Sequence, residues 1–355
     1  MAIRSRLRWS LPVGVAAVAV GASVALPALT ASAGPALPQI SAQSLLSHAL
    51  ASKVDTFSGD ITTNADLGIP ALPDQARSSD LSQLLTGTGT LRVARSGQDK
   101  QRFAVLGSTT ERDIVHNGRD VWTYDSGARK AEHKVLPAAQ AGRQPSEQQV
   151  TPDQAAKRLL GAVGKDTAIS VGRAGSVAGR DAYVLVLKPE SAQSLIGSVQ
   201  VPIDAKTWMP LGFEVLPRDS AKPAVQAEFT SLSYAAPAAS TFQFTPPAGT
   251  KVVQQKAEKG RTMRPREKPS MHRGTPSGEQ FSWTRVVKLG NVSGAKGQAG
   301  AYLNQLKSAG TRVSGTFGSG TLIRSRLLTA LVLDDGRAYV GAVTPQAVEA
   351  AAAKG

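Results

Sequence analysis

The side chains that could carry out acid, base or metal chemistry are few and lie far apart along the chain. Four histidines occur, at His48, His116, His133 and His272. None of them belongs to an H-x-x-x-H or H-E-x-x-H pattern, so the sequence predicts no zinc site. The chain contains no cysteine, which excludes thiolate metal ligands, cysteine nucleophiles, disulfides and lipidation of a thiol.

Other catalytic patterns are also incomplete. Gly87-Thr88-Gly89 and Gly318-Ser319-Gly320 lack the Gly-Lys-Ser/Thr that follows in a phosphate-binding loop, and no Gly-x-Ser-x-Gly elbow occurs. The adjacent Asp334 and Asp335 precede Gly336, a pattern more typical of a hairpin turn than of paired catalytic carboxylates. The sequence therefore predicts a protein that is not an enzyme, with no catalytic residue, metal or cofactor.

Positive charge is the strongest chemical feature of the chain, whose formal net charge is +15. The stretch from Lys251 to Arg273 holds eight basic and two acidic residues. Because polybasic segments bind polyanions, this tract is a candidate contact for an anionic membrane surface, although it could equally be a spacer. Nucleic acid is the less favoured partner, because the N-terminal sequence predicts export from the cytoplasm. The candidate contact residues are Lys251, Lys256, Lys259, Arg261, Arg264, Arg266 and Lys268.

The N-terminus has the layout of an export signal. Arg4, Arg6 and Arg8 precede an uncharged stretch from Leu11 to Leu29, which is followed by Ala31-Ser32-Ala33. This pattern predicts a signal peptide over residues 1–33 that is cleaved after secretion across the cytoplasmic membrane. An uncleaved membrane anchor is the alternative, since about 20 apolar residues can span a bilayer. Either interpretation places the remaining chain outside the cytoplasm, in the cell envelope.

Strands dominate the elements that must position any binding site. A Ser-capped amphipathic helix is predicted over 41–53, and a second helix follows Thr151-Pro152. Turn sequences such as Asn117-Gly118 separate alternating segments, which favours one large antiparallel sheet of about eleven strands with helices covering one side. The predicted strands are 56–66, 87–94, 101–107, 110–116, 120–124, 132–136, 169–174, 181–187, 198–203, 211–216 and 224–234.

The C-terminal part reads as a separate unit. Residues 251–280 are predicted to form a basic flexible linker, and residues 281–355 a small α+β domain. We expect a strand over 281–289, a helix over 298–308, a strand over 321–333, a hairpin turn at Asp334-Asp335-Gly336, a strand over 338–343 and an Ala-rich helix from Pro345. The predicted fold class is therefore mainly β with α, or α+β.

Four colinear stretches between residues 41 and 254 resemble the LolA family of periplasmic lipoprotein carriers. They are Gly89-Thr90-Leu91-Arg92-Val93-Ala94-Arg95, Asn117-Gly118-Arg119-Asp120-Val121-Trp122-Thr123-Tyr124-Asp125, Ile203-Asp204-Ala205-Lys206-Thr207-Trp208-Met209-Pro210-Leu211 and Phe242-Gln243-Phe244-Thr245-Pro246-Pro247-Ala248-Gly249-Thr250. The two-domain layout is also similar to RseB/MucB-type regulators. The whole chain resembles LolA-like proteins of high-GC, single-membrane bacteria, whose tails share the run Asp-Asp-Gly-Arg-x-Tyr-Val-Gly-Ala-Val.

The resemblance implies that residues 34–250 form a curved antiparallel half-barrel. It also implies a function, the binding of a lipid, an acyl chain or a lipoprotein in an apolar cavity, as a carrier or chaperone does. A regulator that binds a membrane-anchored anti-sigma factor and so takes part in sigma-factor regulation is the alternative.

The candidate cavity residues are Leu91, Val93, Arg95, Phe103, Val105, Trp122, Tyr124 and Phe213. Trp122 and Tyr124 lie two apart on a predicted strand and therefore share one face, where they could line a cavity or be ordinary core. In the carriers, the arginine that matches Arg95 helps to hold the empty cavity closed and is followed by proline. Here Ser96 follows it, so Arg95 could instead be a solvated charge at a strand end.

Overall fold

The computed structural model describes residues 35–69, 87–107, 110–137, 160, 164, 166–255, 282–292, 294 and 297–355. The predicted signal peptide at 1–33, most of the predicted second helix and residues 256–280 of the predicted linker lie outside the described residues. Six of the seven basic contact candidates fall in this last stretch, so Lys251 is the member of that set that the structure describes.

The first helix, α1, spans Ala42–Ala51 and begins where the sequence predicts. Ser41 caps it, because the Ser41 hydroxyl oxygen accepts the backbone N–H of Ser44 at 3.1 Å. Leu45 and Ala49 lie one turn apart and are both completely buried. The apolar spacing of the sequence thus gives α1 a single buried stripe, which packs against strands.

The first half of the large sheet is a series of antiparallel neighbours, and short turns join the strands from β2 to β6. Its strands are β1 (Thr56–Ala65), β2 (Gly87–Ser96), β3 (Lys100–Leu106), β4 (Glu111–Asn117), β5 (Asp120–Asp125) and β6 (Lys130–Val135). The turn after Asn117 is the predicted hairpin, and Gly118 there takes a φ of +64°, a value that glycine adopts without strain.

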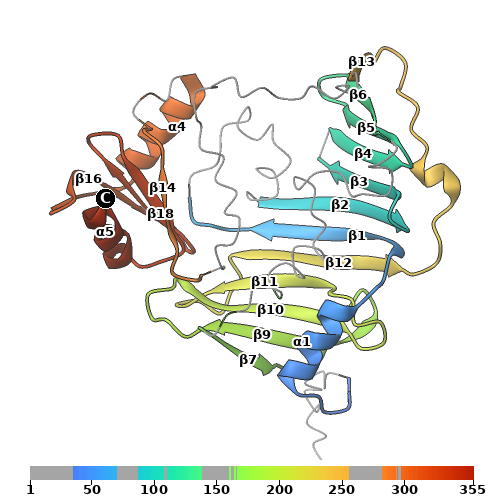
Figure 1. Cartoon of the computed structure of the whole chain (residues 1–355), viewed down its shortest axis with the longest axis horizontal. Helices are drawn as coiled ribbons and strands as arrows, with labels where there is room; N and C mark the ends of the chain where they lie inside the picture. Colours follow the sequence, from blue (N-terminus) through green and yellow to red (C-terminus); the bar gives the residue numbers. More distant parts are fainter. Residues whose placement is uncertain are drawn as a thin grey trace, which may run out of the picture. The chain divides into compact units, whose positions relative to one another are not determined.

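The second half of the sheet consists of β7 (Thr167–Val171), β8 (Gly175–Val177), β9 (Arg180–Pro189), β10 (Ile196–Asp204), β11 (Gly212–Pro217) and β12 (Val225–Ser233). Antiparallel pairing of β1 with β12 joins the two halves. Within the described residues thirteen strands form this sheet, in the order β13-β6-β5-β4-β3-β2-β1-β12-β11-β10-β9-β7, with β8 also paired to β9. The sheet is curved and open, because its two edge strands do not pair (Figure 1).

Local irregularities in the ladder accompany this curvature. The β1–β12 register shifts between Asp60 and Ile61, and the β10–β11 register shifts between Ile196 and Ser198. Such bulges bend and twist a strand. Next to the first bulge, Gly59 leaves room for the Ser231 carbonyl oxygen, which a side-chain carbon at residue 59 would strike.

The start of the predicted linker is a strand in the structure. Residues Lys251–Gln255 form β13, which pairs in parallel with β6 and makes one edge of the sheet. The sequence did not predict this strand, because Val252 and Val253 are the only apolar residues of β13 and a basic tract follows it. The short 3-10 helix η3 (Ala239–Phe242) lies in the segment that leads from β12 to β13.

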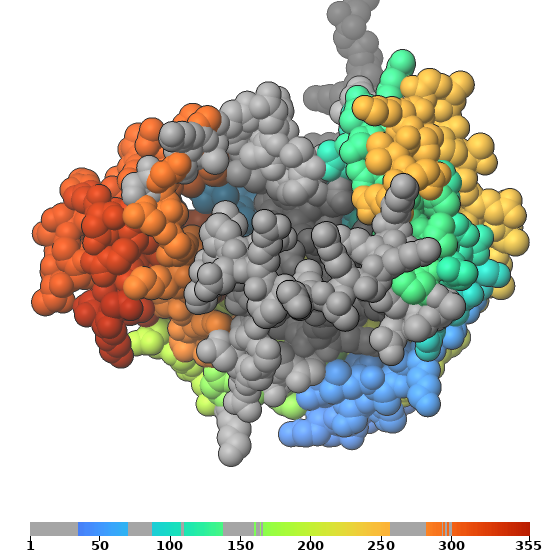
Figure 2. Space-filling model, turned by 45° about the horizontal axis from the view of Figure 1, so that its top comes forward, coloured from blue at the N-terminus to red at the C-terminus, as the bar shows by residue number. Residues whose placement is uncertain are grey.

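A second, five-stranded sheet forms in the described part of the C-terminal region, in the order β14-β18-β17-β16-β15. Its elements are β14 (Val286–Leu289), α4 (Gly297–Ser308), β15 (Thr311–Gly315), β16 (Gly318–Arg324), β17 (Thr329–Leu333), β18 (Ala338–Gly341) and α5 (Pro345–Lys354). Figure 2 shows the described residues of this region, in orange and red, gathered in one body.

One expectation for this region was wrong, and one strand was missed. The single strand predicted over 321–333 is two strands, β16 and β17, because the chain reverses at residues 325–328. The first strand of the hairpin, β15, was not predicted at all; its sequence, Thr-Arg-Val-Ser-Gly, offers a single apolar residue to a periodicity argument. The hairpin at Asp334-Asp335-Gly336 is confirmed, with a φ of +90° at Gly336.

Direct contacts attach the second sheet to the first. The ring N–H of Trp283 donates to the Thr167 hydroxyl at 2.7 Å, and the Trp283 side chain is buried in the core beneath α1. Ser194 and Val343 form an isolated β-bridge. Arg326 donates to Asp66 and to the carbonyl oxygen of Lys222. Backbone and side-chain contacts therefore both fix this attachment.

Candidate functional site

Cross-strand pairing divides the predicted cavity residues between the two faces of the large sheet, because directly paired residues point to the same side. We call the side on which α1 packs the helix face, and the other side the opposite face. Trp122 and Tyr124 lie on the opposite face. The helix face carries Leu91, Val93, Arg95, Phe103, Val105 and Phe213. The eight residues thus divide six to two between the faces, and their role in lining a cavity stays a prediction.

The helix-face candidates are part of a packed core. Leu91, Val93 and Val105 are almost completely buried and belong to the same core cluster as Ile61 and Phe229. Phe103 and Phe213 are partly buried at the margin of the same cluster. These positions therefore contribute to folding, and a role as ligand contacts stays a prediction for them.

Arg95 lies at the end of β2 on the helix face, paired with Phe57 and Gln101. Its side chain is half-buried, and its Nε donates to the Gly97 carbonyl oxygen at 3.0 Å. This bond holds the guanidinium against its own turn. A latch role for Arg95 has no further support from its contacts.

Trp122 and Tyr124 form an aromatic cluster with Phe244 on the opposite face. The ring centroid of Phe244 lies 5.4 Å from that of Trp122 and 5.5 Å from that of Tyr124. The other neighbour of Trp122 is His133, whose ring stacks on it at 4.1 Å. Two of the four motif stretches thus contact each other, and their aromatics fasten the segment before β13 to the sheet.

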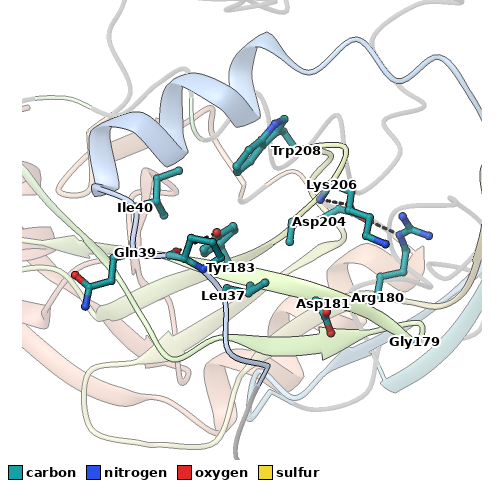
Figure 3. Close-up of a pocket in the computed structure, with 12 residues that line it drawn as sticks. Leu37, Gln39, Ile40, Gly179, Arg180, Asp181, Tyr183, Asp204, Lys206 and Trp208 are labelled. Carbon is teal, nitrogen blue, oxygen red and sulfur yellow. Dashed lines mark hydrogen bonds and ion pairs between the residues drawn. The ribbon is translucent and has the colours of Figure 1, made fainter.

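An open groove beside α1 is the strongest candidate site in the described part of the chain. Its volume is about 560 Å³, within the range of small-molecule sites. Three segments far apart in the sequence form it, namely residues 37–40, the β8–β9 turn and the β10–β11 turn (Figure 3). The lining residues are Leu37, Pro38, Gln39, Ile40, Gly179, Arg180, Asp181, Tyr183, Asp204, Ala205, Lys206 and Trp208.

Aromatic side chains make one wall of this groove. The Trp208 ring stacks on His48 of α1 at 4.4 Å and lies nearly parallel to Tyr183, at 5.9 Å between ring centroids. The Tyr183 hydroxyl donates to the Pro38 carbonyl oxygen at 3.0 Å. Leu37 and Ile40 face the groove from the segment before α1 (Figure 3). Trp208, Leu37 and Ile40 are half-buried and Tyr183 is buried, so the wall is an apolar surface that a flat or chain-like ligand could cover.

A buried carboxylate organises the other wall. Asp204 is 1% exposed, and its Oδ1 accepts the backbone N–H groups of Lys206 and Thr207, each at 2.8 Å. Its Oδ2 pairs with the Arg180 guanidinium and accepts the Tyr234 hydroxyl at 3.2 Å. These four bonds pin the turn that carries Lys206 and Trp208.

Electrostatics keep this network in one protonation state. Burial by itself would raise the pKa of Asp204, but hydrogen bonds from Arg180, Thr207 and Lys206 outweigh burial and lower that pKa below its ordinary value. Burial is also the main cause that raises the pKa of Tyr234 to about 12. Asp204 is therefore ionised and Tyr234 neutral at physiological pH, so neither is poised to exchange a proton.

The turn forces Trp208 into an unusual backbone conformation, with a φ of +60°. A tryptophan in the left-handed region is strained, and such strain concentrates at functional sites. The sequence singled out this turn as a motif but assigned none of its residues to a site. The positive φ was not readable from the sequence, because Trp208 occupies a position where asparagine or glycine would be the usual signal.

A second cavity, of about 570 Å³, lies on the opposite face between β1–β3 and the segment before η3. Its charged groups are already paired, since Arg92 bonds Asp60 at 2.9 Å and Arg102 bonds the buried Asp113. Of the eight predicted cavity residues, Val93 alone lines one of these two described cavities, namely the second. The second cavity is more polar and less aromatic than the groove.

Two carboxyls on the opposite face, Glu214 and Glu228, are joined by Gln226, whose Nε2 donates to Glu214 at 2.8 Å and to Glu228 at 3.2 Å. Burial raises the pKa of both carboxyls. Neither residue lines one of the two cavities described above.

The remaining predicted features are placed as follows. Lys251 is exposed on β13. In the described ranges no three His, Cys, Asp or Glu side chains gather as metal ligands. Of the helices that the structure describes, none is both long and apolar enough to cross a bilayer.

Comparison with known proteins finds similarity in three-dimensional structure only. No protein-family model and no curated protein matches the sequence. Among solved structures, the chain is similar to Pseudomonas aeruginosa MucB in the MucA/MucB complex, with 17% identity, a TM-score of 0.44 and coverage of 88% of this chain and 96% of that one.

Two further similar structures cover the larger part of the chain. LprF from Mycobacterium bovis matches 59% of this chain and 97% of its own, with 11% identity and a TM-score of 0.32. A LolA-superfamily protein from Nitrosomonas europaea matches 58% of this chain and 99% of its own, with 12% identity and a TM-score of 0.26.

Proposed function

We propose that this chain is a LolA-like, exported and non-catalytic protein of the cell envelope that binds a lipid, an acyl chain or an acylated protein. The groove beside α1 is the proposed binding site. The observation that carries the proposal is its aromatic and aliphatic wall, in which Trp208, Leu37 and Ile40 are half-buried and Tyr183 is 7% exposed, in a groove large enough for an acyl chain.

Apolar burial supplies the affinity in this proposal. Each methylene that leaves water for such a wall contributes roughly 0.8 kcal/mol, so a segment of ten carbons is sufficient for micromolar binding before the cost of immobilisation. A tryptophan and a tyrosine with polar tips suit the boundary between a chain and its head group.

The polar groups of the groove support binding rather than reaction. Asp204 has four hydrogen-bond donors, and Arg180 is held by Asp204 and by the Tyr234 ring, 4.4 Å from its guanidinium carbon. A nucleophile or general base needs an accessible lone pair near its substrate. This network has its lone pairs occupied, so it serves to shape the groove.

The first experiment asks whether the protein carries a ligand. Protein purified from the envelope of its own host should release a co-purifying acylated molecule on organic extraction, and native mass spectrometry should show the corresponding mass shift. A mass equal to that of the polypeptide, together with a lipid-free extract, would count against the proposal.

The second experiment locates the ligand. A dibrominated acyl chain quenches tryptophans that it contacts, so adding dibromostearate should quench Trp208 fluorescence, and Trp208→Phe should remove most of that quenching. Trp122→Phe is the matched control, because Trp122 lies on the opposite face of the sheet. Equal quenching in the wild type and both variants would show that the acyl chain binds elsewhere.

The alternative function is regulation through a membrane-anchored anti-sigma factor. The second sheet, fixed to the first through Trp283 and Arg326, offers a further surface to a protein partner and so favours this alternative. Crosslinking in cells should then recover such a membrane protein. An unchanged envelope stress response in a deletion strain would speak against regulation.

A further inference from the structure

One end of the groove carries two exposed side chains of opposite charge, Asp181 and Lys206. The backbone holds them near each other, since the Ala205 N–H donates to the Asp181 carbonyl oxygen at 2.9 Å. Within the described residues, neither side chain forms a hydrogen bond or an ion pair. Both charges are therefore available to a ligand.

The other charged residues of the groove cancel each other. Asp204 and Arg180 form a paired and mostly buried unit. The groove therefore presents no net charge, in contrast to the basic tract that follows β13. An anionic head group would be attracted by Lys206 and repelled by Asp181. A cationic head group would be attracted by Asp181 and repelled by Lys206.

We propose, on the basis of the function proposed above, that the groove takes an amphiphile with a zwitterionic amino-phosphate head group. The acyl chain lies along Leu37, Tyr183 and Trp208. The phosphate lies at Lys206, and the ammonium lies at Asp181. This arrangement pairs both charges of the rim and both charges of the ligand.

In this proposal the head group of the ligand determines selectivity, and its acyl chain determines most of the affinity. Exposed charge pairs are weak and are screened by salt, so each rim contact changes binding about two- to fivefold. Each buried methylene changes it about fourfold. We therefore expect binding of any long chain, with a modest but reproducible preference for the zwitterionic head.

The test compares two probes that share one dibrominated acyl chain, a lysophosphatidylethanolamine and a lysophosphatidylglycerol. Quenching of Trp208 in the exported full chain at low salt should give a lower dissociation constant for the ethanolamine probe, by about two- to fivefold. Asp181→Lys should reverse this preference, because the ammonium is then repelled and the glycerol probe gains a second cation.

A double charge exchange, Asp181→Lys with Lys206→Asp, provides the rescue. It restores one charge of each sign at the rim, so the preference for the ethanolamine probe should return. Both side chains are exposed, and unchanged thermal unfolding of each variant checks that the fold is kept.

The outcomes separate the two proposals. Equal affinity for the two probes in the wild type, and no change of their ratio in Asp181→Lys, would overturn the zwitterion assignment while leaving chain binding intact. A preference for the glycerol probe in the wild type would overturn it as well and would point to an anionic lipid. Absence of Trp208 quenching by either probe would instead remove the binding function itself.

Discussion

At the scale of single residues, Asp204 does the most for the groove. It is buried, and it links the β10–β11 turn to Arg180 and to Tyr234. Removing one partner of such a network leaves the other groups without a counter-charge. The residue is thus a structural requirement for the site, although no ligand need touch it.

Asp204→Asn should therefore lower the free energy of unfolding by about 3 kcal/mol at neutral pH. The pKa of Asp204 is lowered in the folded state, so its stabilising effect is fully present above the unfolded-state value near 4 and is lost as pH falls through the lower, folded value. Urea unfolding curves of both proteins between pH 7 and pH 3 should converge.

The matched control is Asp181→Asn, which removes an exposed carboxylate in the same groove. It should change stability by less than about 0.5 kcal/mol. Equal effects of the two substitutions would show that the Asp204 network is not what holds the turn.

Tyr234 offers a second check at this scale. Its pKa is raised to about 12, mainly by burial, whereas an exposed tyrosine titrates near 10. Alkaline titration followed at the phenolate absorbance should therefore show a phenol that ionises late, near pH 12. Tyr234→Phe should delete the late-titrating phenol, and an unaltered late phase in this variant would assign it to another residue.

At the scale of elements, the segment between β12 and β13 depends on aromatic contacts made across the opposite face. Phe244 touches both Trp122 and Tyr124. Aromatic pairs of this geometry contribute about 1 kcal/mol each beyond area burial. This contact joins two of the four motif stretches, which lie far apart in sequence.

Phe244→Ala should loosen this segment and the β13 edge strand that follows it. We expect a loss of about 1–2 kcal/mol and faster amide exchange in β13. Hydrogen exchange with mass spectrometry measures both regions at once. Gln243→Ala, at an exposed neighbouring position, is the control, and equal protection of β13 in all three proteins would refute the role of Phe244.

At the scale of the whole molecule, the two sheets should unfold together. Arg326 donates to oxygen atoms of Asp66, Pro223, Ser220 and Lys222, and its backbone N–H donates to Leu67. Together with the buried Trp283, these contacts cross from the second sheet to the first. Their number favours one cooperative unit over two independent domains.

Arg326→Ala should cost about 2–3 kcal/mol, because several charge-assisted hydrogen bonds are lost. It should also split the unfolding transition, so that calorimetric and van't Hoff enthalpies no longer agree. Arg324→Ala is the control, since Arg324 is exposed at the end of β16. A single transition in Arg326→Ala with unchanged midpoint would show that docking does not depend on this side chain.

The net charge also acts at this scale. We expect the exported protein to bind anionic vesicles through the basic tract and to be released at 0.5 M salt, where the Debye length falls to about 4–5 Å. Co-sedimentation with vesicles measures this. Binding that survives 0.5 M salt would show that the tract is a spacer and that another surface makes the contact.

The sequence by itself determined the local features. Ser41 caps a helix, Asn117-Gly118 and Asp334-Asp335-Gly336 make hairpins, and alternation along β5 puts Trp122 and Tyr124 on one face. Each of these follows from backbone geometry over a few residues. The weakly patterned strands β13 and β15 escaped prediction because charged or small residues occupy most of their positions.

Tertiary structure alone decided where the candidate groove lies. A period of two residues shows which side chains share a face but not which face receives α1, and only the pairing of β1 with β12 settles that relation across the sheet. The candidates on β2 and β3 became core, while those on β5 turned to the opposite side. The groove arises where residues 37–40, 179–183 and 204–208 meet, and nothing local in a sequence specifies the meeting of three such distant segments.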